Sequence, residues 1–215
     1  MKSLVAPLIA LNLAACAQGD FTAFDPPGTQ QAFGAAVAVP TAAGNFAGIA
    51  PGDRTVVSDA DGNGYAFAYA DVDLADYGAG TGQGRYAVAG VLPTTDLGVQ
   101  PTTGTAAMTG TYALVAVTQA SAVTDPATWA VTRPTGPMTA QIDFGSGVVS
   151  GGSADGALAI SASGDPGFAG GFRGDVTYNG TAGSFAGKLG ADAAVAAVTG
   201  AGGDTFYAGG FSLTR

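Results

Sequence analysis

Residues that could bind a metal ion are gathered in one short segment of the chain. Asp59, Asp61 and Asn63 place side-chain oxygens at the first, third and fifth positions of a calcium loop, and a glycine follows at the sixth. The twelfth position, where a calcium loop needs a bidentate carboxylate, is Ala70, and Asp71 comes one residue late. The spacing therefore favours the tip of a β-hairpin over a calcium site, and we expect no metal or other cofactor.

Composition excludes several kinds of chemistry. The 215 residues include no histidine and no glutamate, so all 16 acidic residues are aspartates. Without imidazole there can be no Ser-His-Asp triad and no histidine-bound zinc. Seven lysines and arginines leave a formal net charge of -9, which disfavours a nucleic-acid partner. No spacing marks two aspartates as a glycosidase pair, so we do not expect an enzyme.

Two side chains further along the chain are candidates for ligand binding. Trp129 is the only tryptophan, and Arg133 follows it closely. Tryptophan and arginine are enriched among the residues that contribute most to binding at protein interfaces. We therefore consider both as ligand-binding residues. The alternative for Trp129 is a structural role, in which its ring closes one end of a barrel.

The start of the chain has the three parts of an export signal. Lys2 supplies a positive charge, residues 4–13 are mostly apolar, and Leu-Ala-Ala precedes Cys16, the only cysteine. This ending resembles a lipobox, the sequence at which a bacterial lipoprotein is cut and acylated. The resemblance implies that residues 1–15 are a signal peptide and that Cys16 carries fatty-acyl chains such as palmitate. Because alanine follows Cys16, it also implies sorting to the outer membrane. The alternative is a secreted protein with a buried cysteine.

Beyond the signal, the sequence predicts a tether followed by short β-strands. Residues 16–32 contain Pro-Pro-Gly and polar residues without a sustained period, which is typical of a tether. The remaining chain alternates apolar and polar residues in short runs between Gly, Pro, Asn and Asp, which predicts an all-β fold. Segments 54–58 and 65–69 should form a hairpin around the acidic motif, and Asn179-Gly180 should form the turn of another. Only the alanine-rich residues 190–198 could be helical.

The alternation also predicts which side chains point into a barrel. An eight-stranded barrel is only just wide enough for side chains to fill, so we expect a packed interior, with binding left to loops and strand edges at its ends. Haem is a poor fit because no histidine can ligate iron. Glycines beside aromatic residues recur in the strands, where a ring can fill the space that a missing Cβ leaves. The residues expected inside are Tyr112, Leu114, Ile142, Phe144, Leu158, Ile160, Tyr178, Phe211 and Leu213.

The second half of the chain resembles the barrel domain of transferrin-binding protein B, a family of Gram-negative surface lipoproteins. The resemblance is carried by residues 112–117, by residues 133–144, and by two glycine-rich stretches at 174–200 and 206–215. It implies an antiparallel barrel of about eight strands over residues 104–215. A strand-rich, handle-like region would precede it over residues 33–103, with a Pro- and Gly-rich boundary at 93–101. The chain departs from the family at Lys188-Leu189-Gly190, where the family has an aromatic-Tyr-Gly step.

Together, the lipobox and the family resemblance imply a lipid-anchored outer-membrane lipoprotein. Its barrel would be a module that binds a solute or an extracellular protein through its loops, on the cell surface or facing the periplasm. Transferrin binding itself is not implied, because the chain is long enough for only one of the two lobes of a full receptor. The alternative is a structural or envelope-interaction lipoprotein with no soluble ligand. The lipobox disfavours a third interpretation, an integral outer-membrane barrel.

Overall fold

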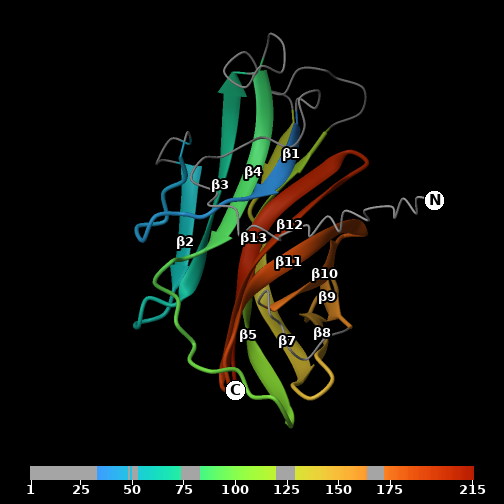
Figure 1. Ribbon diagram of the computed structural model, residues 1–215. Helices are drawn as coiled ribbons and strands as arrows, with labels where there is room; N and C mark the ends of the chain where they lie inside the picture. The colour runs from blue at the N-terminus through green and yellow to red at the C-terminus, as the bar shows by residue number, and fades with distance from the viewer. Residues whose placement is uncertain (1–32, 48, 50–52, 74–82, 120–128, 164–171) are drawn as a thin grey trace, which may run out of the picture.

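The computed structural model describes residues 33–47, 49, 53–73, 83–119, 129–163 and 172–215, which form an all-β fold (Figure 1). Within these ranges there is no helix long and apolar enough to cross a membrane. Thirteen strands follow one another along the chain: β1 (Phe33–Val37), β2 (Arg54–Ser58), β3 (Gly64–Asp73), β4 (Gln83–Val91), β5 (Thr105–Thr118), β6 (Ala130–Thr132), β7 (Thr135–Asp143), β8 (Val148–Ser153), β9 (Leu158–Ala162), β10 (Phe172–Tyr178), β11 (Thr181–Leu189), β12 (Ala193–Gly202) and β13 (Thr205–Thr214).

The first four strands form a separate small sheet in the order β1-β4-β3-β2. β2 and β3 make the hairpin expected around the acidic motif, with Ser58 opposite Gly64. β3 pairs antiparallel with β4, whereas β1 lies parallel to β4 on its other side. Parallel neighbours need a long connection, and here the intervening β2–β3 hairpin provides it.

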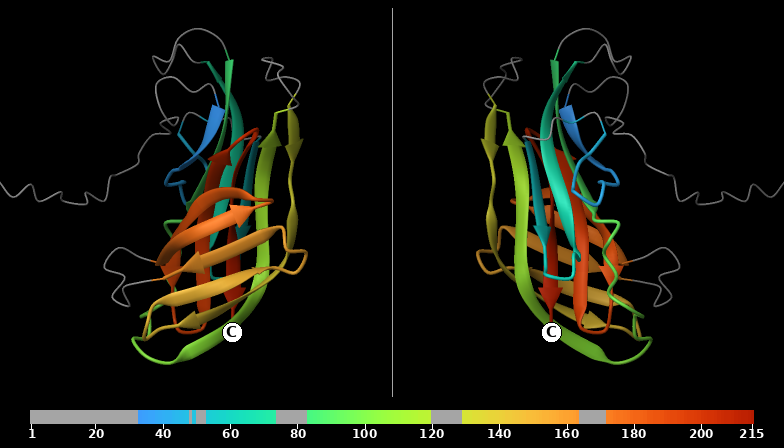
Figure 2. Two further views of the ribbon diagram at one scale, coloured as in Figure 1. Left: turned by 90° about the vertical axis from the view of Figure 1, so that its right-hand side faces the viewer. Right: turned by 90° about the vertical axis from the view of Figure 1, so that its left-hand side faces the viewer.

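The remaining strands build the closed eight-stranded antiparallel barrel that the sequence predicted. β5 and β7 to β13 follow one another around the wall, and β13 closes the barrel by pairing with β5 from Thr205–Thr118 to Thr214–Thr109. β6 pairs with the end of β5, beyond the part that β7 covers. Figure 2 shows β6 standing beside the end of β5 at the margin of the barrel.

Side chains fill the barrel interior. All nine residues predicted to point inward belong to one cluster of buried residues that contact each other. At its centre the rings of Phe172, Phe185 and Phe211 meet edge to face or tilted, with centroids 5.0 to 6.2 Å apart. This geometry suits aromatic quadrupoles and contributes about 0.5–1.5 kcal/mol per pair beyond area burial. The prediction of inward-facing residues is confirmed.

The alanine-rich segment, the one stretch that could have been helical, lies largely in strand β12, in agreement with the predicted all-β fold. Both of its faces are buried, because Ala194, Ala196 and Val198 face the barrel interior while Val195 and Ala197 face the small sheet. A strand buried on both sides loses the apolar–polar alternation that identifies a half-buried strand. Its composition then resembles that of a short helix, and periodicity cannot distinguish the two.

The small sheet packs on the outside of the barrel wall. Tyr65 and Phe67 of β3 join Ala87 and Ala89 of β4 in one buried cluster with outward-facing residues of β5, β12 and β13. The opposite face of the small sheet is covered by its own chain, through Phe46 and neighbouring residues. The two sheets therefore share a second apolar core, separate from the barrel interior.

Rings cover glycines in both cores, as the sequence pattern suggested. A Cβ on Gly210 would lie 2.4 Å from a Tyr65 ring carbon, and one on Gly200 would lie 2.4 Å from Cζ of Tyr207. These distances are far shorter than van der Waals contact. The absence of a side chain at each glycine therefore lets an aromatic ring lie directly on the strand backbone.

Candidate functional site

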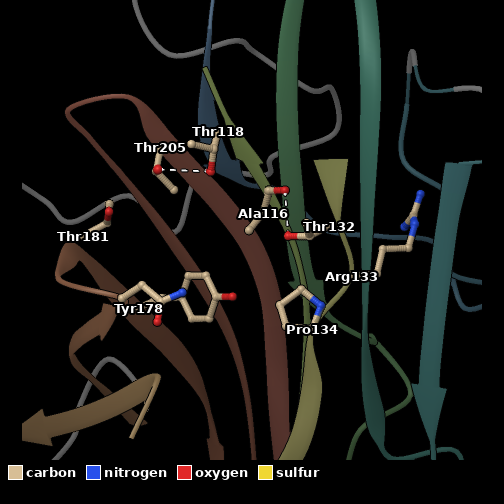
Figure 3. A pocket seen from close by; sticks show the side chains of 9 residues that line it. Ala116, Thr118, Thr132, Arg133, Pro134, Tyr178, Thr181 and Thr205 are labelled. Atoms are coloured by element: carbon tan, nitrogen blue, oxygen red, sulfur yellow. Dashed lines mark hydrogen bonds between the residues drawn. The ribbon is translucent and has the colours of Figure 1, made fainter. Parts of the chain in front are cut away.

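An open groove of about 610 Å³ lies at one end of the barrel (Figure 3). We call it the mouth groove. Its volume is within the range of about 300–1,000 Å³ that is usual for ligand pockets. Among the described lining residues, hydroxyl and amide groups supply most of the side-chain polar atoms, and Arg133 is the one cation. The lining residues are Ala116, Thr118, Thr132, Arg133, Pro134, Tyr178, Asn179, Thr181 and Thr205.

The β10–β11 hairpin forms one wall of the mouth groove. Asn179 and Gly180 have φ angles of 47° and 81°, the positive values that a two-residue type I′ turn needs at both central positions. The predicted Asn-Gly hairpin is therefore confirmed. The turn pairs Tyr178 with Thr181, which fixes both side chains at the barrel end.

The end of β5 and the β6–β7 segment form the opposite wall. Ala113 lies opposite Thr135 in β7, and Ala116 lies opposite Thr132 in β6. Between these pairs, the N–H of Leu114 donates to the carbonyl of Pro134 at 3.0 Å. The register is thus continuous, and β6 and β7 are two parts of one strand. The break between them arises because proline has no N–H to return a hydrogen bond.

Tyr178 lines the groove, and the ring of Tyr207 packs against it. The ring centroids of Tyr178 and Tyr207 are 5.5 Å apart, and the Tyr207 hydroxyl donates to the carbonyl of Thr181 at 3.3 Å. Burial raises the pKa of Tyr207 to about 12 and also raises the pKa of Tyr178 above its ordinary value. Both phenols therefore remain protonated at neutral pH and can donate hydrogen bonds.

A third tyrosine, Tyr112, and an aspartate, Asp155, lie close to Tyr178. The Tyr112 hydroxyl donates to Oδ2 of Asp155 at 3.4 Å, while the Ser153 hydroxyl donates to the other carboxylate oxygen. Burial, followed by the negative charge of Asp155, raises the pKa of Tyr112. The Ser153 hydrogen bond lowers the pKa of Asp155, so this carboxylate stays ionised with its oxygens engaged. The group orders the β8–β9 turn through the backbone of Ala157, which donates to Asp155 at 3.0 Å.

The structure separates the two ligand-binding candidates. Trp129 is only 6% exposed and belongs to the core shared by the two sheets, where its ring meets Phe206 edge to face at 6.1 Å. It lies outside the barrel interior and offers little surface to a partner. Arg133 is exposed and contributes to the groove lining, but its guanidinium points away from Tyr178 (Figure 3). Of the two candidates, only Arg133 lies at the mouth groove.

The acidic motif forms the turn of the β2–β3 hairpin. Oδ1 of Asp59 accepts hydrogen bonds from the N–H groups of Asp61 and Asn63, both at 2.9 Å, and Oδ2 accepts from the Asn63 amide at 3.1 Å. The Asn63 side-chain oxygen accepts from the N–H of Asp96 at 2.8 Å. Backbone donation from Asn63 is the main cause that lowers the pKa of Asp59. The side-chain oxygens of Asp59 and Asn63 that would bind calcium therefore already accept hydrogen bonds.

Other sequence-based sites can be placed only in part. Cys16, the predicted lipidation site, lies outside the described residues, as do the signal and the tether. Among the described ranges, no three His, Cys, Asp or Glu side chains are grouped so that they could hold a metal ion.

Sequence reasoning missed most of the mouth groove. Threonine is common in strands for its β-propensity, so Thr118, Thr132 and Thr205 carried no signal of a shared site. One signal was available, because the Asn-Gly turn placed its neighbours Tyr178 and Thr181 at a barrel end. Which strand ends lie opposite that turn depends on the barrel closure between β13 and β5.

Comparisons with known proteins give structural matches only. No protein-family model matches the sequence, and no curated protein does. Among solved structures, the chain is similar to the intact Ap-TbpB with its N and C lobes, at 11% identity and a TM-score of 0.39. It is also similar to isotype 1 transferrin binding protein B from serogroup B Neisseria meningitidis, at 12% identity and a TM-score of 0.40. The matches cover 75% and 78% of this chain but only 37% and 36% of those proteins, so each involves about a third of the larger chain.

Proposed function

We propose that this protein is a lipid-anchored outer-membrane lipoprotein whose barrel binds a ligand at the mouth groove. The observation that carries the proposal is the contrast between a barrel interior filled by side chains and an open, hydroxyl-lined groove at its end. Buried aromatic and aliphatic side chains occupy the interior. At the mouth groove, a ligand can form hydrogen bonds with hydroxyl, amide and backbone groups, and no charged group has to be buried.

The geometry supports binding rather than catalysis. Tyr178 and Tyr207 remain protonated, and the threonine hydroxyls at the groove have neither histidine nor glutamate available as a base. Asp155 is held in a turn by Ser153 and Tyr112. These groups can donate and accept hydrogen bonds but are not arranged as a nucleophile with its base.

A structural lipoprotein without a soluble ligand is the second candidate. It is favoured by the extensive contact between the small sheet and the barrel wall, which gives β12 and β13 two buried faces. A double-layered wall of this kind would also suit a rigid spacer in the cell envelope.

The membrane anchor is tested by the mass of the mature protein. Protein extracted from membranes with detergent should begin at Cys16 and carry the added mass of fatty-acyl chains, because the preceding Leu-Ala-Ala resembles a lipobox. A Cys16→Ser variant behind an ordinary cleavable signal should be soluble without detergent, since the several acyl chains that make anchoring stable are gone. An unmodified mature N-terminus at another residue would refute the anchor.

Ligand binding is tested on the soluble Cys16→Ser protein by thermal shift with neutral sugars, amino acids and short peptides. A ligand at about 100 times its dissociation constant should add roughly 2.7 kcal/mol to the free energy of unfolding. Thr205→Arg, which places a long side chain at the groove, should abolish the shift. Thr109→Arg, an exposed site at the other end of β5, serves as the matched control. If no class of solute shifts the melting temperature, the structural alternative is favoured.

A further inference from the structure

Among the described residues, the β6–β7 segment has an unpaired backbone edge at the mouth groove. In an antiparallel pair, alternate residues direct their backbone groups toward the partner strand. The Leu114–Pro134 hydrogen bond shows that Pro134 faces β5. Val131, Arg133 and Thr135 therefore direct their N–H and C=O groups away from β5. In the described part of the chain, no backbone group pairs with these three residues.

This edge has a defined end. β8 begins to pair with β7 only at Met138, and the N–H of Ala154 donates to the carbonyl of Pro137 at 3.1 Å. Pro137 itself has no N–H, so it ends the row of outward donors. Pro134 does not interrupt the row, because its nitrogen faces β5. The edge thus offers three donor–acceptor pairs in sequence, at alternate residues from 131 to 135.

Side chains on the two faces of this edge differ in character. Thr132 and Pro134 line the mouth groove, across from Tyr178. On the outer face Val131 is 37% exposed, and Arg133 is exposed with no ion pair to any described residue. Arg133 is a cation on a chain with a formal net charge of -9.

We propose that this edge binds an extended peptide segment of a partner protein by β-strand addition, with an acidic residue of the peptide opposite Arg133. The inference deepens the proposed function and rests on it, because it names the ligand class of the mouth groove. Backbone hydrogen bonds to Val131, Arg133 and Thr135 would hold the peptide. Its alternate side chains would enter the groove near Tyr178, in the manner of other sheet-edge peptide binders.

Charge argues against a second copy of this chain as the occupant. Two copies paired edge to edge by a two-fold axis at this site would bring Arg133 against Arg133. Like charges opposite each other across strands are destabilising. Both copies also carry a net charge of -9. An acidic peptide avoids the first conflict and gains an ion pair at the same position.

The test uses the soluble Cys16→Ser protein and a capped seven-residue probe of alternating threonine and valine with a central aspartate. Isothermal titration should show saturable one-to-one binding. Replacing the central aspartate of the probe by lysine should weaken binding about fivefold, since a cross-strand charge pair contributes up to about 1 kcal/mol. Methylating the backbone nitrogens of the probe that face the edge should abolish binding. The methyl groups remove the probe's N–H donors to the β6–β7 carbonyls and leave the protein unchanged.

Two variants locate the probe on the protein. Val131→Pro removes one outward N–H without altering the β5 ladder and should weaken binding about tenfold, with the melting temperature changed little. Arg133→Asp should reverse the preference, so that the lysine probe binds better than the aspartate probe. Arg173→Asp, an exposed arginine at the start of β10, is the matched control and should leave the preference unchanged.

Each contrary outcome is informative. If neither probe binds, or if binding is indifferent to Val131→Pro and to N-methylation, the edge is not a peptide site. If maltose binds at the groove and the peptides do not, the ligand class is wrong while the proposed binding function stands. If the protein is a dimer that Val131→Pro converts to a monomer, a second copy occupies the edge and the inference is overturned.

Discussion

Replacing Tyr207 with alanine is expected to destabilise the protein by about 3–5 kcal/mol, the usual cost of removing a large aromatic side chain from a core. Tyr207 is completely buried, lies against Tyr178, and donates its hydroxyl to the carbonyl of Thr181. Gly200→Ala should also be destabilising, by about 1–3 kcal/mol, because the new Cβ would lie 2.4 Å from Cζ of Tyr207. Urea unfolding followed by circular dichroism measures both losses.

The two substitutions should not be additive. The three atoms nearest to a Cβ at Gly200 all belong to Tyr207, so the cost of Gly200→Ala should largely vanish once the ring is removed. Gly202→Ala is the matched control on the same strand, since its nearest neighbour would be Cγ2 of Thr181 at an ordinary 3.7 Å. Strictly additive losses would show that the ring does not occupy the space above Gly200.

Much of the barrel could be predicted from sequence because strands such as β7, β10 and β11 are exposed on one face. Along β10, for example, Val176 and Tyr178 are buried while Arg173 and Thr177 are exposed, and this alternation is readable without a structure. The Asn179-Gly180 turn was equally readable, because few residues other than Asn and Gly adopt positive φ at both central positions. Local rules of this kind identified most strands and the filled interior.

What could not be predicted depends on contacts between distant segments. The alanine-rich β12 became ambiguous because the small sheet buries its second face, and nothing within the segment reveals that cover. Trp129 was placed at an interface or at a barrel end, but its position against Phe206 follows from how β13 closes on β5. The mouth groove combines residues from five strand ends, so its composition becomes visible only once the barrel is closed.

The second large effect is expected when the small sheet is removed. We propose that residues 104–215 fold alone, because every member of the barrel cluster lies between Ala106 and Leu213. The fragment should give a β-type circular dichroism spectrum and melt cooperatively, but at a lower temperature than the full chain. Its wall would expose the apolar residues that the small sheet covers, and large exposed apolar patches promote association. Sedimentation should therefore detect oligomers. The residues newly exposed are Val115, Val117, Val195, Ala197, Phe206 and Ala208.

One substitution on this wall should affect stability differently in the full chain and in the fragment. Val195→Thr keeps the side-chain shape but adds a hydroxyl, which is costly when buried without a partner and harmless in water. In the full chain, where Val195 is 1% exposed, it should lower the melting temperature. In the fragment it should reduce oligomerisation and leave stability almost unchanged. A disordered fragment would show that the barrel cannot fold without the small sheet. The buried cluster between the small sheet and the barrel wall would then be required to hold β12 and β13 in place.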